Sequence, residues 1–141
     1  MSRPSRWAAR AADPAQGRAP RAAYAEVAEF DESSFSAADY DALDGSWASM
    51  GRDAGRAGKE SPDGLIDDDV ALSQPWGFDV AQVDAPVLLV HGREDRVSTF
   101  AHSAWLLDHL PKRRALVRPR DGHISVLEAV PVALDRLLVR R

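Results

Sequence analysis

A five-residue apolar run at positions 86–90 (PVLLV) constrains the fold more than any other stretch, because no polar residue alternates within it. A run of this kind is typical of a strand that is covered on both faces, as in a parallel sheet. A helix is predicted over residues 100–110, with Ser98 or Thr99 as its N-cap. A second short strand follows at 115–117. Strand, helix and returning strand together predict a right-handed βαβ unit and an α/β fold class.

A last helix is predicted over residues 125–139, and Pro131 should kink it or split it into two pieces. Leucine and valine side chains recur along one side of this segment at helical spacing. The residues expected on the buried side are Leu127, Val130, Leu134, Leu137 and Leu138.

The segment from Tyr24 to Ser73 is predicted to be helical with loops between its helices. Ser36 and Asp39 have the spacing of a capping box, and an aromatic and apolar stripe follows at helical spacing. Such a stripe lines a substrate pocket in some proteins, and more often it is plain core. The stripe consists of Tyr40, Leu43, Trp47 and Met50, and glycines at 51, 55 and 58 are expected to end its helix in a flexible link.

Two charged stretches outside the strand–helix region have a structural explanation and a functional one. The first, residues 1–23, has five arginines and three prolines, and is expected to be an irregular or disordered N-terminal segment rather than a targeting peptide. The second is the run of three aspartates at 67–69, for which complementation of a helix N-terminus is preferred over a metal site.

Composition excludes several classes of function. The formal net charge is −4, with 22 acidic and 18 basic residues, which gives no reason to expect nucleic acid or an anionic membrane as a partner. There is no cysteine, so disulfides, thiolate metal sites and cysteine nucleophiles are excluded, and a cytoplasmic location is expected. The longest apolar run is too short to span a bilayer. Neither a cofactor nor a metal is predicted.

The two predicted strands each end in a polar turn that carries a chemically useful side chain. Asp95 lies five residues after Val90, and His123 lies six after Val117. Because the carboxyl ends of parallel strands meet at one edge of a sheet, the carboxylate and the imidazole should lie within hydrogen-bond reach. An acid and a histidine in this chain order are the last two members of a Ser…Asp…His triad, although a purely structural pair explains the pattern equally well.

Other acids and histidines in the region are weaker candidates. Glu94 is a rival acid, but neighbouring side chains in a tight turn diverge, and Asp121 is too near His123 in sequence to reach around its ring. His91 is expected to pack or hydrogen-bond locally at the strand end. His102 and His109 fall on the intervening helix, where solvent or rim positions are expected.

From Pro75 to Leu138 the chain resembles the C-terminal part of an α/β-hydrolase. The resemblance rests on PWGFD, PVLLVHGREDRVS, the helix AHSAWLLDHLP and the closing DGHISVL. In that family a strand ending in HGxxD delivers the triad acid, and a later strand ending in GH delivers the triad histidine. The matching positions here are Asp95 and His123. The resemblance also implies that residues 24–74 are the end of a helical cap (lid), and that 75–141 are the last strands and helices of the core.

The nucleophile that this family places on a G-x-S-x-G elbow is missing from the sequence. The nearest motif, around Ser49, lacks the first glycine and has no strand before it, so Ser49 is not accepted as a nucleophile. The chain is therefore expected to be the C-terminal fragment of a hydrolase, inactive alone, which acts on a small-molecule substrate when an N-terminal part completes it. The alternative is a non-catalytic remnant or interaction module. An exposed sheet edge would favour self-association.

Overall fold

The computed structural model describes residues 17–27, 30–75 and 77–139, and these fall into two compact units. One unit combines described residues up to 32 with 49–77, and the other combines 33–48 with those from 78 onward. The segment predicted as a cap, 24–74, is therefore divided between the units. Its role as a cap stays a prediction, and each unit is described by itself.

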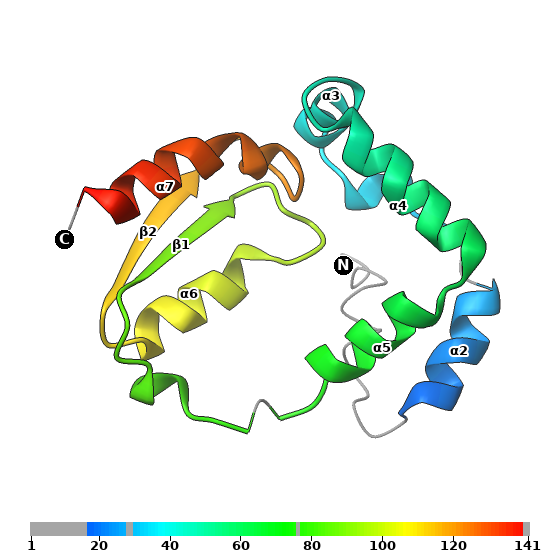
Figure 1. The fold of residues 1–141 in the computed structure, drawn as a ribbon, viewed down its shortest axis with the longest axis horizontal. Helices are drawn as coiled ribbons and strands as arrows, with labels where there is room; N and C mark the ends of the chain where they lie inside the picture. Colours follow the sequence, from blue (N-terminus) through cyan, green and yellow to red (C-terminus); the bar gives the residue numbers. More distant parts are fainter. Residues whose placement is uncertain (1–16, 28–29, 76, 140–141) are drawn as a thin grey trace, which may run out of the picture. The chain divides into compact units, whose positions relative to one another are not determined.

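The second unit is built on a parallel βαβ arrangement, as predicted. Strands β1 (Val87–Gly92) and β2 (Arg113–Arg118) pair in parallel, with His91 opposite Val117. Helix α6 (Phe100–His109) connects them. Helix α7 (Val130–Leu138) follows β2, and α6 and α7 lie on opposite sides of the two-stranded sheet (Figure 1). The described chain is thus mixed α/β, which is compatible with part of a larger α/β fold.

Shorter elements complete this unit. Helix α3 (Ala37–Asp44) begins with the predicted capping box, in which Ser36 Oγ accepts the N–H of Asp39 and the Asp39 carboxylate accepts the N–H of Ser36. The other short elements are the 3₁₀ helices η2 (Val80–Gln82) and η3 (Ser125–Ala129), and η1 (Glu32–Ser34) begins at the last residue before this unit.

The predicted last helix is divided, because η3 ends at Ala129 and α7 starts at Val130 with Pro131 in its first turn. A proline there removes an N–H that would have no helical partner anyway. The expected buried side is wrong. The side chains that η3 and α7 bury are the small ones of Ser125, Ala129 and Ala133, whereas four of the five predicted residues are 38–67% exposed. These four are Val130, Leu134, Leu137 and Leu138.

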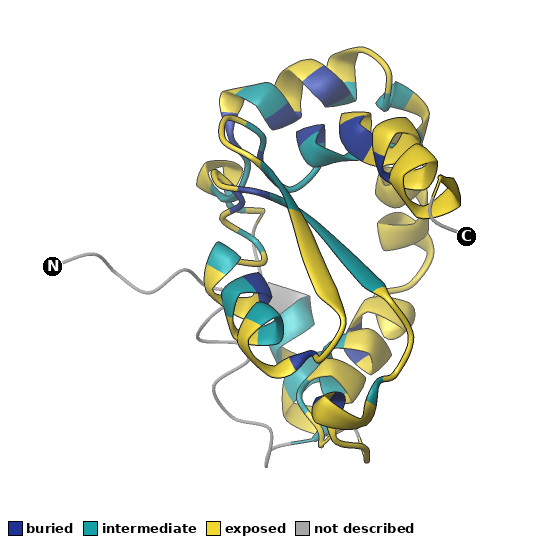
Figure 2. Ribbon diagram, turned by 90° about the vertical axis from the view of Figure 1, so that its left-hand side faces the viewer, coloured by how far each residue is buried: buried dark blue, intermediate teal, exposed yellow. Residues whose placement is uncertain are grey.

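The prediction of a strand covered on both faces also fails for this chain. The residues of β1 are only partly buried up to Gly92, and most of β2 is exposed (Figure 2). The apolar run has the composition of a fully covered strand, but one helix on each side and one neighbouring strand do not supply enough surface to cover it.

The first unit is helical, with α2 (Arg18–Val27), α4 (Ala48–Glu60) and α5 (Asp63–Leu72). Residues 18–23, expected to be irregular, belong to α2; Pro20 lies in its first turn, where proline is tolerated. Residues 1–16 lie outside the described part of the chain.

Two helix predictions in this region are corrected. Glycines 51, 55 and 58 do not end a helix but lie within α4, whose remaining residues are mostly good helix formers. The stripe from Tyr40 to Met50 is not one helical face, because α3 ends at Asp44 and α4 begins at Ala48. Gly45 caps α3, with its N–H directed at the carbonyls of Asp41 and Ala42.

The three aspartates at 67–69 lie in the middle of α5 rather than at its N-terminus, so complementation of the helix dipole is wrong for them. Two of them, Asp67 and Asp69, pair instead with arginines of α2. Arg18 Nε lies 2.8 Å from Asp67 Oδ1, and Arg21 pairs with Asp69. Ile66, 1% exposed, supplies the apolar contact in the same helix.

The PWGFD segment that precedes the α/β region bends at Gly77. Gly77 has φ of +75°, a backbone conformation that residues with a side chain rarely adopt. Phe78 is 61% exposed, and Trp76 lies outside the described residues. Among the helices of residues 17–27, 30–75 and 77–139, none has both the length and the apolar character that crossing a bilayer would need.

Candidate active site

Backbone hydrogen bonds join the two turns that follow β1 and β2. Arg93 N–H donates to Arg118 O at 2.9 Å, and Glu94 N–H donates to Asp121 O at 3.0 Å. Gly92 is required at this crossing, because a Cβ there would lie 2.2 Å from Asp121 O. The turn that carries Asp95 and the turn that carries His123 are therefore held together by the main chain.

Asp95 is buried, with 9% of its surface exposed, and both of its carboxylate oxygens accept hydrogen bonds. Oδ1 accepts the N–H groups of Val97 at 2.9 Å and Ser98 at 2.8 Å, which fixes the side chain to its own loop. Oδ2 lies 3.0 Å from Nδ1 of His123. The predicted contact between Asp95 and His123 is confirmed; the catalytic role of the pair stays a prediction.

The hydrogen bond to Asp95 fixes the tautomer of His123. A carboxylate only accepts, so Nδ1 carries the proton, and the lone pair of a neutral ring is then on Nε2. The hydrogen bond from Nδ1 to Asp95 raises the pKa of His123; burial opposes this, and the charges of Asp95 and Asp39 add to the rise. The side chain is 37% exposed, and the ring lies 6.4 Å from that of Phe35.

The Asp95 carboxylate is held in its charged form. Burial would raise its pKa, but the hydrogen bond from His123, the N–H groups of Ser98 and Val97 and the charge of His123 outweigh burial, so its pKa lies below the ordinary value. An ionised acid at Nδ1 stabilises a proton on the imidazole, which is what a triad acid does.

A third residue, Asp39, belongs to the site and was not found by sequence reasoning. It lies on α3 with no exposed surface, and its Oδ1 accepts the N–H groups of Ile124 at 2.8 Å and Ser125 at 2.9 Å. The capping-box spacing revealed its bond to Ser36. Nothing in the spacing could reveal that the other oxygen of the same carboxylate serves a turn 85 residues away.

The remaining candidates lie where their local sequence suggested. Glu94 is exposed, and Asp121 Oδ2 accepts from Arg118 Nε at 2.6 Å. His102 and His109 are exposed on α6.

His91 is bound locally, as expected. Its Nε2 donates to the Ser98 carbonyl at 2.9 Å, and its Nδ1 lies 2.7 Å from Ser103 Oγ. Its Nε2 is 3.7 Å from Asp95 Oδ2, longer than a hydrogen bond, so His91 does not take the place of His123.

Two serines near the pair donate their hydroxyl protons to Asp39. The hydroxyls of Ser36 and Ser125 each lie 2.9 Å from an oxygen of Asp39, to which they donate their single protons. Ser49 lies in the first turn of α4, and the element directly before it is the helix α3, not a strand. Across residues 17–27, 30–75 and 77–139, no three His, Asp or Glu side chains are grouped so that they could hold a metal ion.

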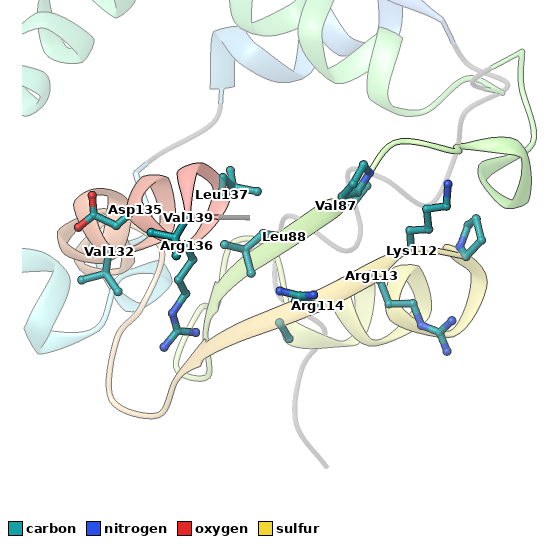
Figure 3. Close-up of a pocket in the computed structure, with 13 residues that line it drawn as sticks. Val87, Leu88, Lys112, Arg113, Arg114, Val132, Asp135, Arg136, Leu137 and Val139 are labelled. Carbon is teal, nitrogen blue, oxygen red and sulfur yellow. The ribbon is translucent and has the colours of Figure 1, made fainter. Parts of the chain in front are cut away.

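A pocket lies at the other end of the same sheet, between the amino ends of the strands and α7 (Figure 3). Its lining combines apolar and basic side chains, and includes Val87, Leu88, Arg114, Val132, Arg136 and Leu137. Neither Asp95 nor His123 lines it. The acid and histidine therefore do not open into this pocket.

Comparison with known proteins gives one partial similarity. The chain is 41% identical over 46 residues to pimeloyl-[acyl-carrier protein] methyl ester esterase of Nitrosomonas europaea. The similar region covers 33% of this chain and 18% of that protein, so the chain spans well under two thirds of the length of this relative. No protein-family model and no solved structure matches the chain.

Proposed function

We propose that this chain supplies the acid and the base of an α/β-fold hydrolase, with Asp95 as the acid and His123 as the base. The observation that carries the proposal is the 3.0 Å hydrogen bond between Asp95 Oδ2 and His123 Nδ1, made where two parallel strands end. Catalytic groups of open α/β sheets gather beyond the carboxyl ends of the strands. The partial similarity to an esterase supports the same conclusion.

With a serine nucleophile, His123 Nε2 takes the hydroxyl proton of the serine and gives it to the leaving group; it then takes a proton from the water that hydrolyses the acyl-enzyme and returns it to the serine. With an aspartate nucleophile, which attacks as the carboxylate, His123 acts only on the water that hydrolyses the covalent intermediate. Asp95 stabilises the imidazolium that forms in each case. The substrate class is a small molecule with an ester, lactone, amide or related bond. Polypeptide beyond these 141 residues supplies the nucleophile, serine or aspartate, together with the oxyanion-binding groups.

A fusion enzyme tests this proposal. The 141-residue chain is fused behind the N-terminal part of the Nitrosomonas esterase, and hydrolysis of short p-nitrophenyl esters is measured. We expect turnover that falls by about 10³-fold or more in His123→Ala. His109→Ala, which changes an exposed histidine on α6, is the matched control and should keep the rate. A folded fusion whose rate is the same with and without His123 would rule out the catalytic assignment.

The second candidate function is an interaction module that keeps part of the fold without catalysis. The observation that favours it is the row of exposed leucines on α7, together with the outer edge of β1, which pairs with no further strand among the described residues. Exposed apolar surface and an unpaired strand edge both favour association with another chain, a second copy included. This candidate predicts that the chain self-associates as its concentration rises. It also predicts that the fusion protein binds another chain but does not hydrolyse p-nitrophenyl esters.

A further inference from the structure

The Asp39 carboxylate accepts five hydrogen bonds. Oδ1 accepts from Ile124 N–H at 2.8 Å, and from Ser125 N–H and Ser125 Oγ at 2.9 Å each. Oδ2 accepts from Ser36 N–H and Ser36 Oγ, both at 2.9 Å. Five donors from two distant segments thus converge on one fully buried carboxylate. Capping of α3 needs only the donors from Ser36, so the other three require a separate explanation.

Those three donors come from the residues directly after His123, and the residue before it is fixed as well. Gly122 N–H donates to Ser125 Oγ at 2.7 Å, and Ser125 in turn is bound to Asp39. The main chain of Gly122 passes so close to the carboxylate that a Cβ there would lie 2.0 Å from Asp39 Oδ2. Both sides of His123 are therefore held to a single side chain on α3.

We propose that Asp39 is a positioning residue for His123, which holds the 122–125 turn so that Nδ1 keeps its bond to Asp95 and Nε2 stays available for proton transfer. This inference deepens the proposed hydrolase function and rests on it. Asp39 does not touch the reacting atoms, because its oxygens are occupied by the turn and by Ser36. It acts through the geometry of the turn and, over a longer distance, through its charge.

The electrostatics agree with this arrangement. Burial would raise the pKa of Asp39, but hydrogen bonds from Ser125, Ser36 and Ile124 hold its pKa far below the ordinary value, so it stays charged. The ionisable groups that face His123 or its partner are Asp95 at 3.0 Å, His91 at 3.7 Å from Asp95, and Asp39 by its charge. Of these, only the two aspartates favour a protonated His123.

The replacement Asp39→Asn distinguishes positioning of the 122–125 turn by a charged hydrogen-bond acceptor from packing by a side chain of the same size. An asparagine has nearly the same shape, but its NH₂ group cannot accept a hydrogen bond. In either orientation of the amide, the NH₂ group of Asn faces a hydrogen-bond donor. That donor is the N–H of Ser36 in one orientation and the N–H groups of Ile124 and Ser125 in the other. The variant therefore weakens the turn or the cap, and it removes the charge in both cases.

The test is NMR on the 141-residue chain, which needs no turnover. The ring signals of His123 and His91 are followed against pH, and amide exchange is measured at Ile124 and Ser125. In Asp39→Asn we expect the pKa of His123 to fall and exchange at these two amides to speed up by about tenfold or more. The control Asp79→Asn changes a carboxylate that caps η2 through the Ala81 N–H, and it should leave both readouts unchanged.

A second variant covers the case in which Asp39→Asn does not fold. Ser125→Ala removes one of the hydroxyls on Asp39 and keeps both N–H bonds, and it should change both readouts in the same direction by less. In the active fusion, Asp39→Asn should lower kcat by about tenfold or more with little change in KM. A folded variant with the wild-type His123 pKa and wild-type exchange would overturn the inference. If the fusion is inert but Asp39→Asn still changes both NMR readouts, the proposed hydrolase function fails and the positioning role of Asp39 stands.

Discussion

The two ends of the same small sheet differ sharply. At the carboxyl ends of β1 and β2, the buried carboxylates of Asp39 and Asp95 accept hydrogen bonds on every oxygen. At the amino ends, Val87 and Leu88 of β1 line a pocket together with Leu137 of α7 (Figure 3), and Leu137 is 49% exposed. The two carboxylates beside His123 have all their oxygens hydrogen-bonded within the described residues, whereas the apolar surface around the strands is only partly covered.

This contrast follows from how the two kinds of stabilisation work. Hydrogen bonds and capping are satisfied by a few donors at fixed places, so a small number of residues in the two turns and α3 is enough. Burial of apolar side chains needs area on every side, and a two-stranded sheet with two helices provides little. The site-bearing end should therefore be sensitive to small changes, and the α7 face should tolerate large ones.

The largest effect is expected from a single methyl group at the site-bearing end. Gly122→Ala would place Cβ 2.0 Å from Asp39 Oδ2 and 2.6 Å from Ser36 Oγ, so the turn or α3 must move. We expect a loss of about 3 kcal/mol in the free energy of unfolding, measured with urea. Gly55→Ala is the control, because its Cβ meets nothing within 4 Å; it should gain about 1 kcal/mol in the middle of α4. Equal stability of Gly122→Ala and wild type would contradict the close approach.

A smaller effect is expected from pH, and its sign follows from the pKa shifts. The lowered pKa values of Asp39 and Asp95 contribute stability that is present above their ordinary value of 3.8 and is lost as pH falls through the folded values. The raised pKa of His123 contributes stability below 6.5 that is lost as pH rises through its folded value.

The urea midpoint should therefore be highest between about pH 4 and pH 6.5. Asp39→Asn should flatten the acid side of this profile, because its carboxylate no longer titrates. An acid side as steep as that of the wild type would mean that other carboxylates dominate the acid transition.

The smallest effect is expected on the α7 face. Leu138 is 67% exposed, so Leu138→Lys should change the free energy of unfolding by no more than about 0.5 kcal/mol. It should also reduce any self-association seen by sedimentation velocity, because it places a charge in the apolar row. The contrasting variant, Ala133→Asp, buries a charge at a position that is 8% exposed and should cost at least about 2 kcal/mol. A large loss for Leu138→Lys would mean that the leucine face is already covered.

What the sequence could predict depended on how local the cause was. The strand–helix–strand order, the capping box at Ser36, the effect of Pro131 and the approach of Asp95 to His123 all follow from short motifs or from the parallel topology. The predicted burial of the α7 leucines failed because helical spacing shows that a face is apolar, not that another element covers it.

Long-range partners were equally out of reach of the sequence patterns. The run of aspartates at 67–69 predicts a helix end, but Asp67 and Asp69 pair with Arg18 and Arg21, more than 40 residues away. Asp39 was recognised only as a cap for the same reason, since its second set of partners is 85 and 86 residues distant.

The most direct test of the central claim is NMR of the His123 ring in the 141-residue chain. If Asp95 and His123 form their pair within this chain, the Nδ1 proton should give a strongly downfield signal, and the pKa of His123 should lie above 6.5. In Asp95→Asn the signal should disappear and the pKa should fall. A His123 ring that titrates at the ordinary value in wild type, unchanged in Asp95→Asn, would contradict the account.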